Sequence, residues 1–493
     1  MPEPTPPTSV PPTTPTTPTT PTTPPRPGPR RRTALAGLAG AVGGGALLPL
    51  PAWGADDRRP GAVRAPALLP SDRAVVTRAS AERALEHISA LADGIGPRIG
   101  GTPSEHAARD YLAGVLDGLG YTVELESFPT ADRFLGELAA APGTAPLPDD
   151  LCWQVGASPQ GGLGTTVTGT VVDLGTLPTG EWPADLAGAV VLVDAATLDV
   201  LRAAVPVAAA RGAVAVVRLP ADAADPVRRT SASSPTLVEP TPLPVVGVAQ
   251  AQKARLRAAL AAGPLSLQVS TTAYTGLTSS NVLAERRGRL APAPGGEAVM
   301  VCAHYDTVIG APGANDDGSG TGLCLELARV LRPMATQRAV KVALWGAEEL
   351  GLVGSRYHVA QLPPEERARL VAVLNNDMVA TSWDPADRYW VLSWDGQANA
   401  ATDAVVGAAE RLGYGPRLTP VFTRGASDHQ SFQEVGIAAG NFSWRGEAAG
   451  QPVLEPPYHS PEDTVARNIS LERLQVSLEL VGSAAHRLAG PSR

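Results

Sequence analysis

The stretch Ala298-Val299-Met300-Val301-Cys302-Ala303-His304 is a continuous apolar run that ends in a histidine. A short apolar run rich in valine is typical of a strand buried on both faces of a parallel sheet. Strict alternation of apolar and polar residues would instead indicate a strand with one face in water. Residues 298–304 are therefore predicted to form a central strand.

Helices and strands alternate along the chain after this strand. Helices are predicted over 320–331, 398–412 and 470–488, and strands over 340–345, 370–374, 389–392 and 436–442. This alternation predicts an α/β fold with a mixed, mostly parallel sheet and helices on both of its faces. In such sheets the functional site lies at the carboxyl ends of the strands.

Residues that can bind metal ions gather where these strands end. They are His304 and Asp306, Asn315-Asp316-Asp317-Gly318, Glu348 and Glu349, Asp377, and the later histidines His429 and His459. Each alone has an ordinary structural explanation; Asn-Asp-Asp-Gly, for example, is typical of a turn and a helix N-cap. Together, four or more carboxylates at one sheet edge would repel one another unless cations held them. The combination therefore predicts a metal site.

The kinds of ligand indicate which metal it is. Imidazole and carboxylate without thiolate favour zinc or a neighbouring transition ion, whereas calcium and magnesium prefer oxygen ligands alone. The set exceeds the needs of one catalytic zinc, which indicates two metals about 3.5–4 Å apart, bridged by one carboxylate. Cys302 and Cys324 are expected to pack in the core. With Cys152 they make three cysteines, too few for a disulfide framework.

Residues 131–274 differ in their pattern of apolar runs and helices from the chain on either side. Short apolar runs recur there, with few helices between them, and the interval contains no histidine. We expect a β-rich domain inserted into a catalytic domain whose two parts are residues 78–130 and 275–490. The formal net charge of −8 argues against a nucleic-acid binder held by a basic field.

The first 55 residues are predicted to be a targeting segment rather than a folded domain. Residues 1–30 contain 13 Pro and 10 Thr and should be disordered. Arg31-Arg32-Thr33-Ala34-Leu35 and the small apolar residues that follow are similar to a twin-arginine export signal. We expect an exported or secreted protein without stable membrane insertion once the signal is removed. An uncleaved membrane anchor is the alternative, although Pro49 and Pro51 make a poor spanning helix.

A set of motifs in this order resembles a known family. They are Gly96-Pro97-Arg98-Ile99-Gly100-Gly101-Thr102-Pro103, His304-Tyr305-Asp306, Gly313-Ala314-Asn315-Asp316-Asp317-Gly318-Ser319-Gly320, Trp345-Gly346-Ala347-Glu348-Glu349-Leu350-Gly351, Asn376-Asp377-Met378, Ser427-Asp428-His429 and Tyr458-His459-Ser460-Pro461-Glu462-Asp463. The chain resembles the secreted di-zinc aminopeptidases of the aminopeptidase S and aminopeptidase Y type. The insert resembles the protease-associated domain of that family, on the weaker motif Gly188-Ala189-Val190-Val191-Leu192-Val193-Asp194.

This resemblance implies a role for each candidate residue. His304 and Asp377 would bind one zinc, Glu349 and His459 the other, and Asp316 would bridge the two, with a cis peptide bond to Asp317. Glu348 would be the general base, and Tyr458 would donate a hydrogen bond to the oxyanion. Spacing alone does not distinguish Glu348 from Glu349. Asp306, two residues after His304, could orient its imidazole.

The expected function is removal of N-terminal residues from peptide substrates by a water that two zinc ions activate. Phe432, Ile437 and Phe442 could form an apolar pocket for the terminal side chain or could equally be core. Some members of the family have an arginine directly before the Ser-Asp motif, where this chain has Ala426, and the nearest arginine is Arg424. A related di-zinc carboxypeptidase or dipeptidase is the alternative function, and a non-enzymatic binding ectodomain is the third. A site for a substrate carboxylate would need Arg424 and Arg445.

Overall fold

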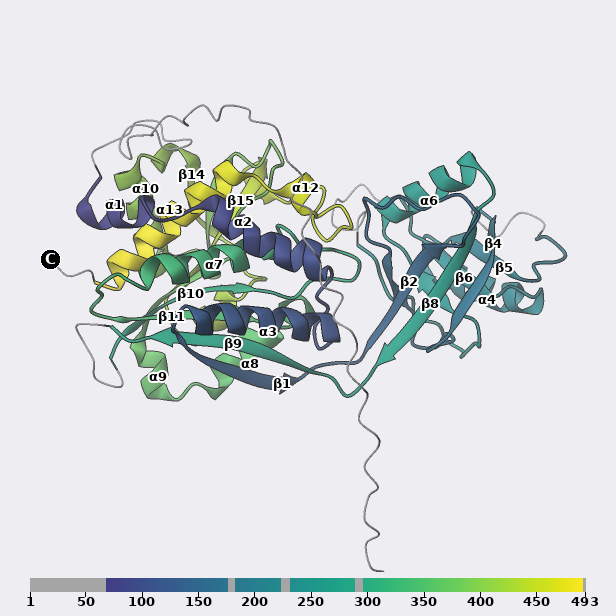
Figure 1. Ribbon diagram of the computed structural model, residues 1–493, viewed down its shortest axis with the longest axis horizontal. Coiled ribbons are helices and arrows are strands. Elements are labelled where there is room, and N and C mark those ends of the chain that lie inside the picture. Colours follow the sequence, from purple (N-terminus) through teal and green to yellow (C-terminus); the bar gives the residue numbers. More distant parts are fainter. Residues whose placement is uncertain (1–67, 176–181, 223–230, 289–295, 491–493) are drawn as a thin grey trace, which may run out of the picture. The chain divides into compact units, whose positions relative to one another are not determined.

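A computed structural model describes residues 68–175, 182–222, 231–288 and 296–490 (Figure 1). The predicted disordered segment and export signal, residues 1–55, lie outside the described residues. No helix in the described ranges combines the length and the apolar character that crossing a membrane requires.

The described strands form one large mixed sheet and one closed barrel. The large sheet has the order β1 (Thr122–Pro129), β9 (Thr278–Arg286), β11 (Ala339–Trp345), β10 (Ala298–His304), β12 (Leu370–Asn376), β15 (Ala439–Ala448), β13 (Arg388–Ser393) and β14 (Leu418–Thr423), with β16 (Gln451–Val453) beside β15. Its centre, from β11 through β10 and β12 to β15, is parallel, and β9 and β13 pair with it in the antiparallel direction. The prediction of a mixed, mostly parallel sheet is confirmed.

The barrel is formed by chain between β1 and β9. Its strands are β2 (Arg133–Ala140), β3 (Gln154–Ala157), β7 (Val245–Gly247), β6 (Ala215–Leu219), β5 (Ala189–Asp194), β4 (Thr166–Asp173) and β8 (Ser266–Tyr274), in this spatial order. Two helices accompany them, α4 (Leu198–Ala210) and α6 (Gln250–Ala262). The predicted β-rich insertion is thus present, and its strands close on themselves so that none is left as an open edge.

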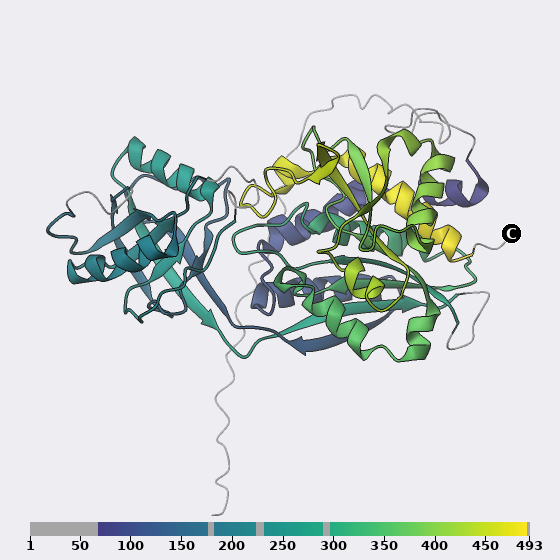
Figure 2. The same ribbon diagram turned by 180° about the vertical axis from the view of Figure 1, so that it is seen from behind.

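Helices cover both faces of the large sheet, as the views in Figures 1 and 2 show. The described helices outside the barrel are α1 (Pro70–Val76), α2 (Ala81–Ser89), α3 (Pro103–Gly118), α7 (Gly318–Leu331), α8 (Val353–Gln361), α9 (Pro364–Arg369), α10 (Ala400–Leu412), α11 (His429–Gln433), α12 (Val465–Asn468) and α13 (Leu471–Leu488), with a π-turn at Ala90–Ile95 and 3-10 turns at Glu348–Leu350 and Gly415–Arg417. The sequence did not predict α8 and α9, because neither carries a clear apolar face; no residue of α9 is buried.

Strand β10 explains why the sheet needs helices on both sides. Every residue of β10 is buried, and alternate side chains enter different apolar clusters. Val299 and Val301 pack in the cluster that contains α7 and α13, whereas Met300 and Cys302 pack in the cluster that contains Phe432 of α11. Period-two alternation with both faces apolar is what the continuous apolar run predicts.

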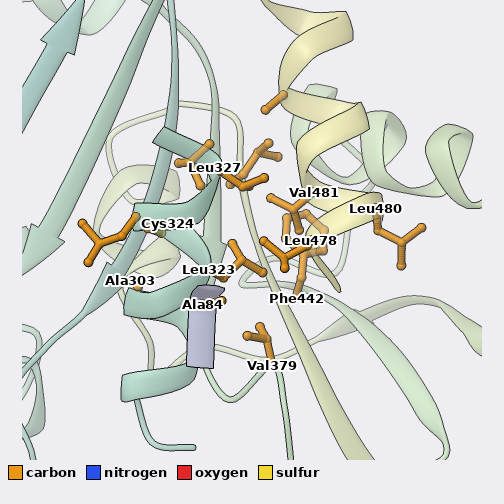
Figure 3. Close-up of a cluster of buried hydrophobic side chains, with 14 of the residues drawn as sticks. Ala84, Ala303, Leu323, Cys324, Leu327, Val379, Phe442, Leu478, Leu480 and Val481 are labelled. Carbon is orange, nitrogen blue, oxygen red and sulfur yellow. The ribbon is translucent and has the colours of Figure 1, made fainter. Parts of the chain in front are cut away.

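The larger cluster joins the helices to one face of the sheet. Figure 3 shows Leu323 and Leu327 of α7 beside Leu478 and Val481 of α13. These side chains are at most 1% exposed. Burial of Cys302 and Cys324 confirms their expected place in the core. This close packing holds α7, which begins directly after the Asp-Asp motif, against the sheet.

Candidate metal centre

Three neighbouring parallel strands end at the same edge of the large sheet. Strands β11, β10 and β12 are adjacent in that order. His304 is the last residue of β10, Asp377 directly follows β12, and Glu348 and Glu349 begin the 3-10 turn that follows β11. The topology therefore brings to one place side chains that are far apart in the sequence, as expected for an α/β sheet.

Asp316 lies between the two candidate histidine ligands. Its Oδ1 is 3.2 Å from Nε2 of His304, and its Oδ2 is 3.1 Å from Nε2 of His459. One carboxylate thus turns one oxygen toward each imidazole, the arrangement in which a carboxylate can bridge two metal ions. The peptide bond from Asp316 to Asp317 is cis, as the resemblance implied.

One further candidate ligand lies beside each histidine. Oδ1 of Asp377 lies 3.9 Å from Nε2 of His304, and Oε1 of Glu349 lies 3.1 Å from Nε2 of His459. The structure thus brings together all five predicted ligands. They divide into two groups that share Asp316, in the way that the resemblance implied.

The donor atoms of these residues fit bound cations. Among the described residues, Asp377 Oδ1, Glu349 Oε1 and His459 Nε2 are buried without a hydrogen-bond partner. Buried polar atoms without partners are costly, so donor atoms that face one another in this way fit a bound cation. Burial alone would lower the pKa of His304, but the surrounding carboxylates, Glu348 foremost, raise it well above its ordinary value. The cluster attracts positive charge, and its imidazole and carboxylate donors suit zinc.

Asp317 has a different task from Asp316. Its Oδ1 accepts hydrogen bonds from the backbone N–H of Gly320 at 2.9 Å and of Met378 at 3.2 Å, and its Oδ2 accepts one from the N–H of His304. The carboxylate therefore caps α7 and joins it to the ends of β10 and β12. Because backbone donors occupy both oxygens, Asp317 supports the ligands rather than joining them.

Asp306 fastens the loop that carries the two glutamates. Its Oδ1 accepts a hydrogen bond from the N–H of Glu348 at 2.9 Å, and its Oδ2 accepts one from the N–H of Glu349 at 3.2 Å. The distance from Oδ1 to Nδ1 of His304 is 3.6 Å, which is longer than a hydrogen bond. Its contact with the glutamate loop is therefore stronger than the predicted contact with the imidazole.

A cavity of about 350 Å³ opens onto the cluster. Glu348 and Tyr458 line it together with the ligands His304, Asp316, Glu349 and Asp377. Oε2 of Glu348 lies 3.9 Å from Nε2 of His304. The ring of Tyr458 stacks on that of His459, with 3.7 Å between the ring centroids and 20° between the planes. Both predicted catalytic residues thus border the space in which a substrate would lie.

A buried polar network under Asp316 was not predicted from the sequence. Asp463 accepts hydrogen bonds from the backbone N–H of Asn315 and of Asp316, each at 3.0 Å, and from the Asn468 amide at 2.8 Å. The same two asparagines donate to Glu455. Burial raises the pKa of Asp463 to about 6 and that of Glu455 to about 7. Only the motif around His459 pointed to Asp463, and nothing in the sequence pointed to Glu455.

Arg98, from the Gly-Pro-Arg motif, holds the loop that leads to Asp316. Its guanidinium donates to the carbonyls of Tyr305, Pro312 and Gly313 at 2.6–2.9 Å, and the side chain is fully buried. Glycine is needed at Gly313, where φ is +64° and a Cβ would lie 2.3 Å from the methyl of Thr307. The first part of the catalytic domain thus shapes a site whose candidate ligands all come from the second part.

Glu105 of α3 makes a second connection of this kind. Its Oε1 accepts hydrogen bonds from Ser279 Oγ at 2.6 Å and from the N–H of Ala347 at 3.2 Å, and its Oε2 accepts one from the N–H of Gly101 at 2.5 Å. Ala347 directly precedes Glu348 and has a φ of +53°. Burial raises the pKa of Glu105 to about 8. Glu105 therefore holds the backbone just before the predicted base.

We expect Glu105→Gln to lower kcat with little change in KM. Glutamine would place an N–H group against a backbone N–H from which Glu105 now accepts a hydrogen bond. The lost hydrogen bond should cost about 1–3 kcal/mol of stability and move the loop that carries Glu348 and Glu349. A displacement of this loop should cost on the order of tenfold or more in kcat. Steady-state kinetics and thermal unfolding, with Glu86→Gln on the exposed side of α2 as the control, would test this. An unchanged kcat would show that Glu105 does not position the loop.

Four residues that the sequence placed near the site are structural. His429 is buried, and its Nε2 lies 2.8 Å from the backbone oxygen of Arg424; burial lowers its pKa to about 4. Phe432, Ile437 and Phe442 are at most 5% exposed and pack in the core clusters. Of the two roles that the sequence left open for Phe432, Ile437 and Phe442, the structure shows core packing, and none of the three lines the cavity.

Comparison with known proteins agrees with this geometry. The sequence profile of peptidase family M28 matches residues 281–485. Aminopeptidase YwaD of Bacillus subtilis is 33% identical over 416 residues, which are 82% of this chain and 84% of YwaD. The structure of BSAP, a zinc aminopeptidase from Bacillus subtilis, aligns with a TM-score of 0.58 at 31% identity and covers 83% of this chain and 96% of that one. An aminopeptidase from an Aneurinibacillus strain aligns with a TM-score of 0.53 at 29% identity, over 86% of this chain and 97% of its own. The chain belongs to peptidase family M28.

Proposed function

We propose that this protein is a zinc-dependent aminopeptidase that holds two zinc ions and removes N-terminal residues from peptides. The observation that carries the proposal is the carboxylate of Asp316, which turns one oxygen toward His304 and the other toward His459. Aminopeptidase activity is named for the relatives YwaD and BSAP, and zinc for BSAP. His304 and Asp377 would hold one ion, and His459 and Glu349 the other.

The chain's own residues would then carry the proton transfers. Bound zinc supplies an acidified water and polarises the peptide carbonyl. Glu348 borders the cavity beside His304 and would take the proton of the attacking water and pass it to the leaving amine. Tyr458, stacked on His459 at the cavity wall, would donate a hydrogen bond to the oxyanion.

The terminal side chain of the substrate is expected to be apolar. Leu352 and Met378 border the cavity and would contact it. The carboxylates on the same cavity would attract the free α-amine, which favours an aminopeptidase over an endopeptidase. Leu352 and Met378 thus take the place of Phe432, Ile437 and Phe442, for which the sequence left a pocket and the core equally open.

The test is cleavage of leucine-p-nitroanilide beside its N-acetylated form. We expect only the free-amine substrate to be cleaved, activity to be lost with a chelator, and zinc to restore it. The protein should contain about two zinc ions per chain. Cleavage of C-terminal residues from N-blocked peptides, without cleavage of leucine-p-nitroanilide, would instead support the carboxypeptidase alternative.

We also propose that the barrel is a protease-associated domain and that residues 1–55 direct export by a twin-arginine route. The first proposal is supported by the position of the barrel between β1 and β9. The second is supported by the sequence alone, at Arg31-Arg32. Replacing both arginines by lysine should retain the protein inside a host that has this export route; unchanged secretion would contradict the proposal.

A further inference from the structure

Arg445 of β15 is a buried arginine whose guanidinium is not satisfied by the protein. The residue is 4% exposed and borders the cavity above the metal centre. Among the described residues, no hydrogen-bond partner exists for its buried Nε and Nη1 atoms. A buried charge normally has a partner, because leaving it unpaired costs several kcal/mol.

The strand directs this side chain toward the site. Side chains alternate along a strand, so Asn441, Ser443 and Arg445 share one face of β15. Oδ1 of Asn441 accepts a hydrogen bond from the N–H of the candidate ligand Asp377 at 3.1 Å. Trp444, on the other face, donates to Ser477 of α13 instead. Arg445 therefore extends from the face of β15 that also supports the metal ligands.

A second arginine lies close by. Arg424 borders the same cavity, burial lowers its pKa, and the charge of Arg445 lowers the pKa further. Within the described part of the chain, neither guanidinium forms an ion pair with a carboxylate. Arg356, the third arginine at this cavity, does so, with 3.3 Å from its Nη2 to Oε1 of Glu434. Two guanidinium groups that border one cavity without an ion-paired carboxylate of the protein make a site for an anion.

Other buried arginines in this protein are different. Arg98 donates to several backbone carbonyls in the loop before Asp316. Arg473 donates to the carbonyls of Thr381, Trp383 and Asp384. In both, the protein itself satisfies the guanidinium, and the role is structural. Arg445 has the burial of these residues without their partners, so its partner is expected to come from outside the chain.

We propose that Arg445, with Arg424 beside it, binds a carboxylate of the peptide substrate. A guanidinium offers parallel N–H donors that match the two oxygens of a carboxylate. The carboxylate would be either the C-terminus of a short peptide or an acidic side chain next to the scissile bond. The inference rests on the proposed aminopeptidase function and adds that the enzyme prefers substrates with an anionic group.

Paired substrates that differ only in this charge test the proposal. The pairs are Leu-Gly with Leu-Gly-amide, for the C-terminus, and Leu-Asp-amide with Leu-Asn-amide, for the side chain. For at least one pair, we expect the zinc-loaded wild-type protein to show a kcat/KM about tenfold higher for the anionic member, mainly through KM. In Arg445→Met the ratio should fall to about one, and Arg445→Lys should keep part of it.

The control variant is Arg388→Met. Arg388 lies directly opposite Arg445 in the register of β13 with β15, but it is exposed and donates to the carbonyl of Pro416. Arg388→Met should leave the kcat/KM ratio of both substrate pairs as in the wild-type protein. Equal kcat/KM within both pairs for the wild-type protein would overturn the inference, as would a preference that survives in Arg445→Met. If leucine-p-nitroanilide is still cleaved, either of these two results leaves the aminopeptidase proposal standing. If the wild-type protein cleaves no free-amine substrate, the aminopeptidase proposal and the carboxylate-binding proposal are both overturned.

Discussion

Glu348→Gln is expected to lower kcat about 10²–10⁴-fold while the protein keeps its zinc. Glutamine has nearly the shape of glutamate but cannot accept a proton from the attacking water. The family resemblance places Glu348 outside the two groups of candidate ligands; distance does not, since its Oε2 lies 3.9 Å from Nε2 of His304, as far as Oδ1 of the candidate ligand Asp377. Loss of Glu348 should therefore affect turnover and leave the metal content near that of the wild type.

The neighbouring residue provides the contrast that makes this experiment decisive. Glu349 has its Oε1 at 3.1 Å from Nε2 of His459, so Glu349→Gln should reduce the zinc bound per chain as well as the activity. Glu410→Gln, on the exposed side of α10, is the control for the substitution itself. Zinc per chain and kcat would be measured for all three variants. If Glu348→Gln lost zinc and Glu349→Gln kept its full zinc content, Glu348 would be the ligand and Glu349 the base.

The sequence could predict the strands and the ligand set because both depend on local patterns. The apolar run 298–304 predicts β10 with its observed bounds, and polar residues at the strand ends predict the site edge. The assignment of Glu348 as the base and Glu349 as the ligand came from the family resemblance. Two consecutive residues in a turn show no periodicity from which their separate roles could be predicted. In the structure Glu349 lies nearer to His459 and Glu348 nearer to His304, and the roles of ligand and base stay predictions from the resemblance.

Residues that support the ligands could not be predicted from the sequence. Glu105 accepts from Ala347, which is 242 residues away, and Asp463 accepts from Asp316, which is 147 residues away. Neither contact can be recognised in the local sequence, since a carboxylate on a helix, such as Glu105, or in a loop, such as Asp463, reads the same whether it is buried or solvated. Arg445 illustrates the same limit: only the structure shows which of the arginines lack partners.

Asp316→Asn is expected to reduce bound zinc from about two per chain to one or fewer and to abolish most activity. Each oxygen of Asp316 faces a different imidazole, at 3.2 Å and 3.1 Å, so replacing either with an NH₂ group removes a ligand from one ion. The lost negative charge weakens the attraction for the other ion as well. Among the described residues, no carboxylate other than Asp316 lies within 4.0 Å of both His304 and His459.

Metal-dependent stability gives a measurement that does not depend on turnover. An ion that binds only the folded protein stabilises it by RT ln(1 + [L]/Kd), so zinc should raise the Tm of the wild-type protein after removal of metal by a chelator. We expect this rise to be much smaller in Asp316→Asn and unchanged in Asp117→Asn, an exposed carboxylate on α3. The backbone network around Asp463 holds residue 316 through its N–H, which the substitution preserves, so the fold should survive. A full zinc complement and a wild-type rise in Tm for Asp316→Asn would contradict the bridging role and leave the two ions held by separate residues.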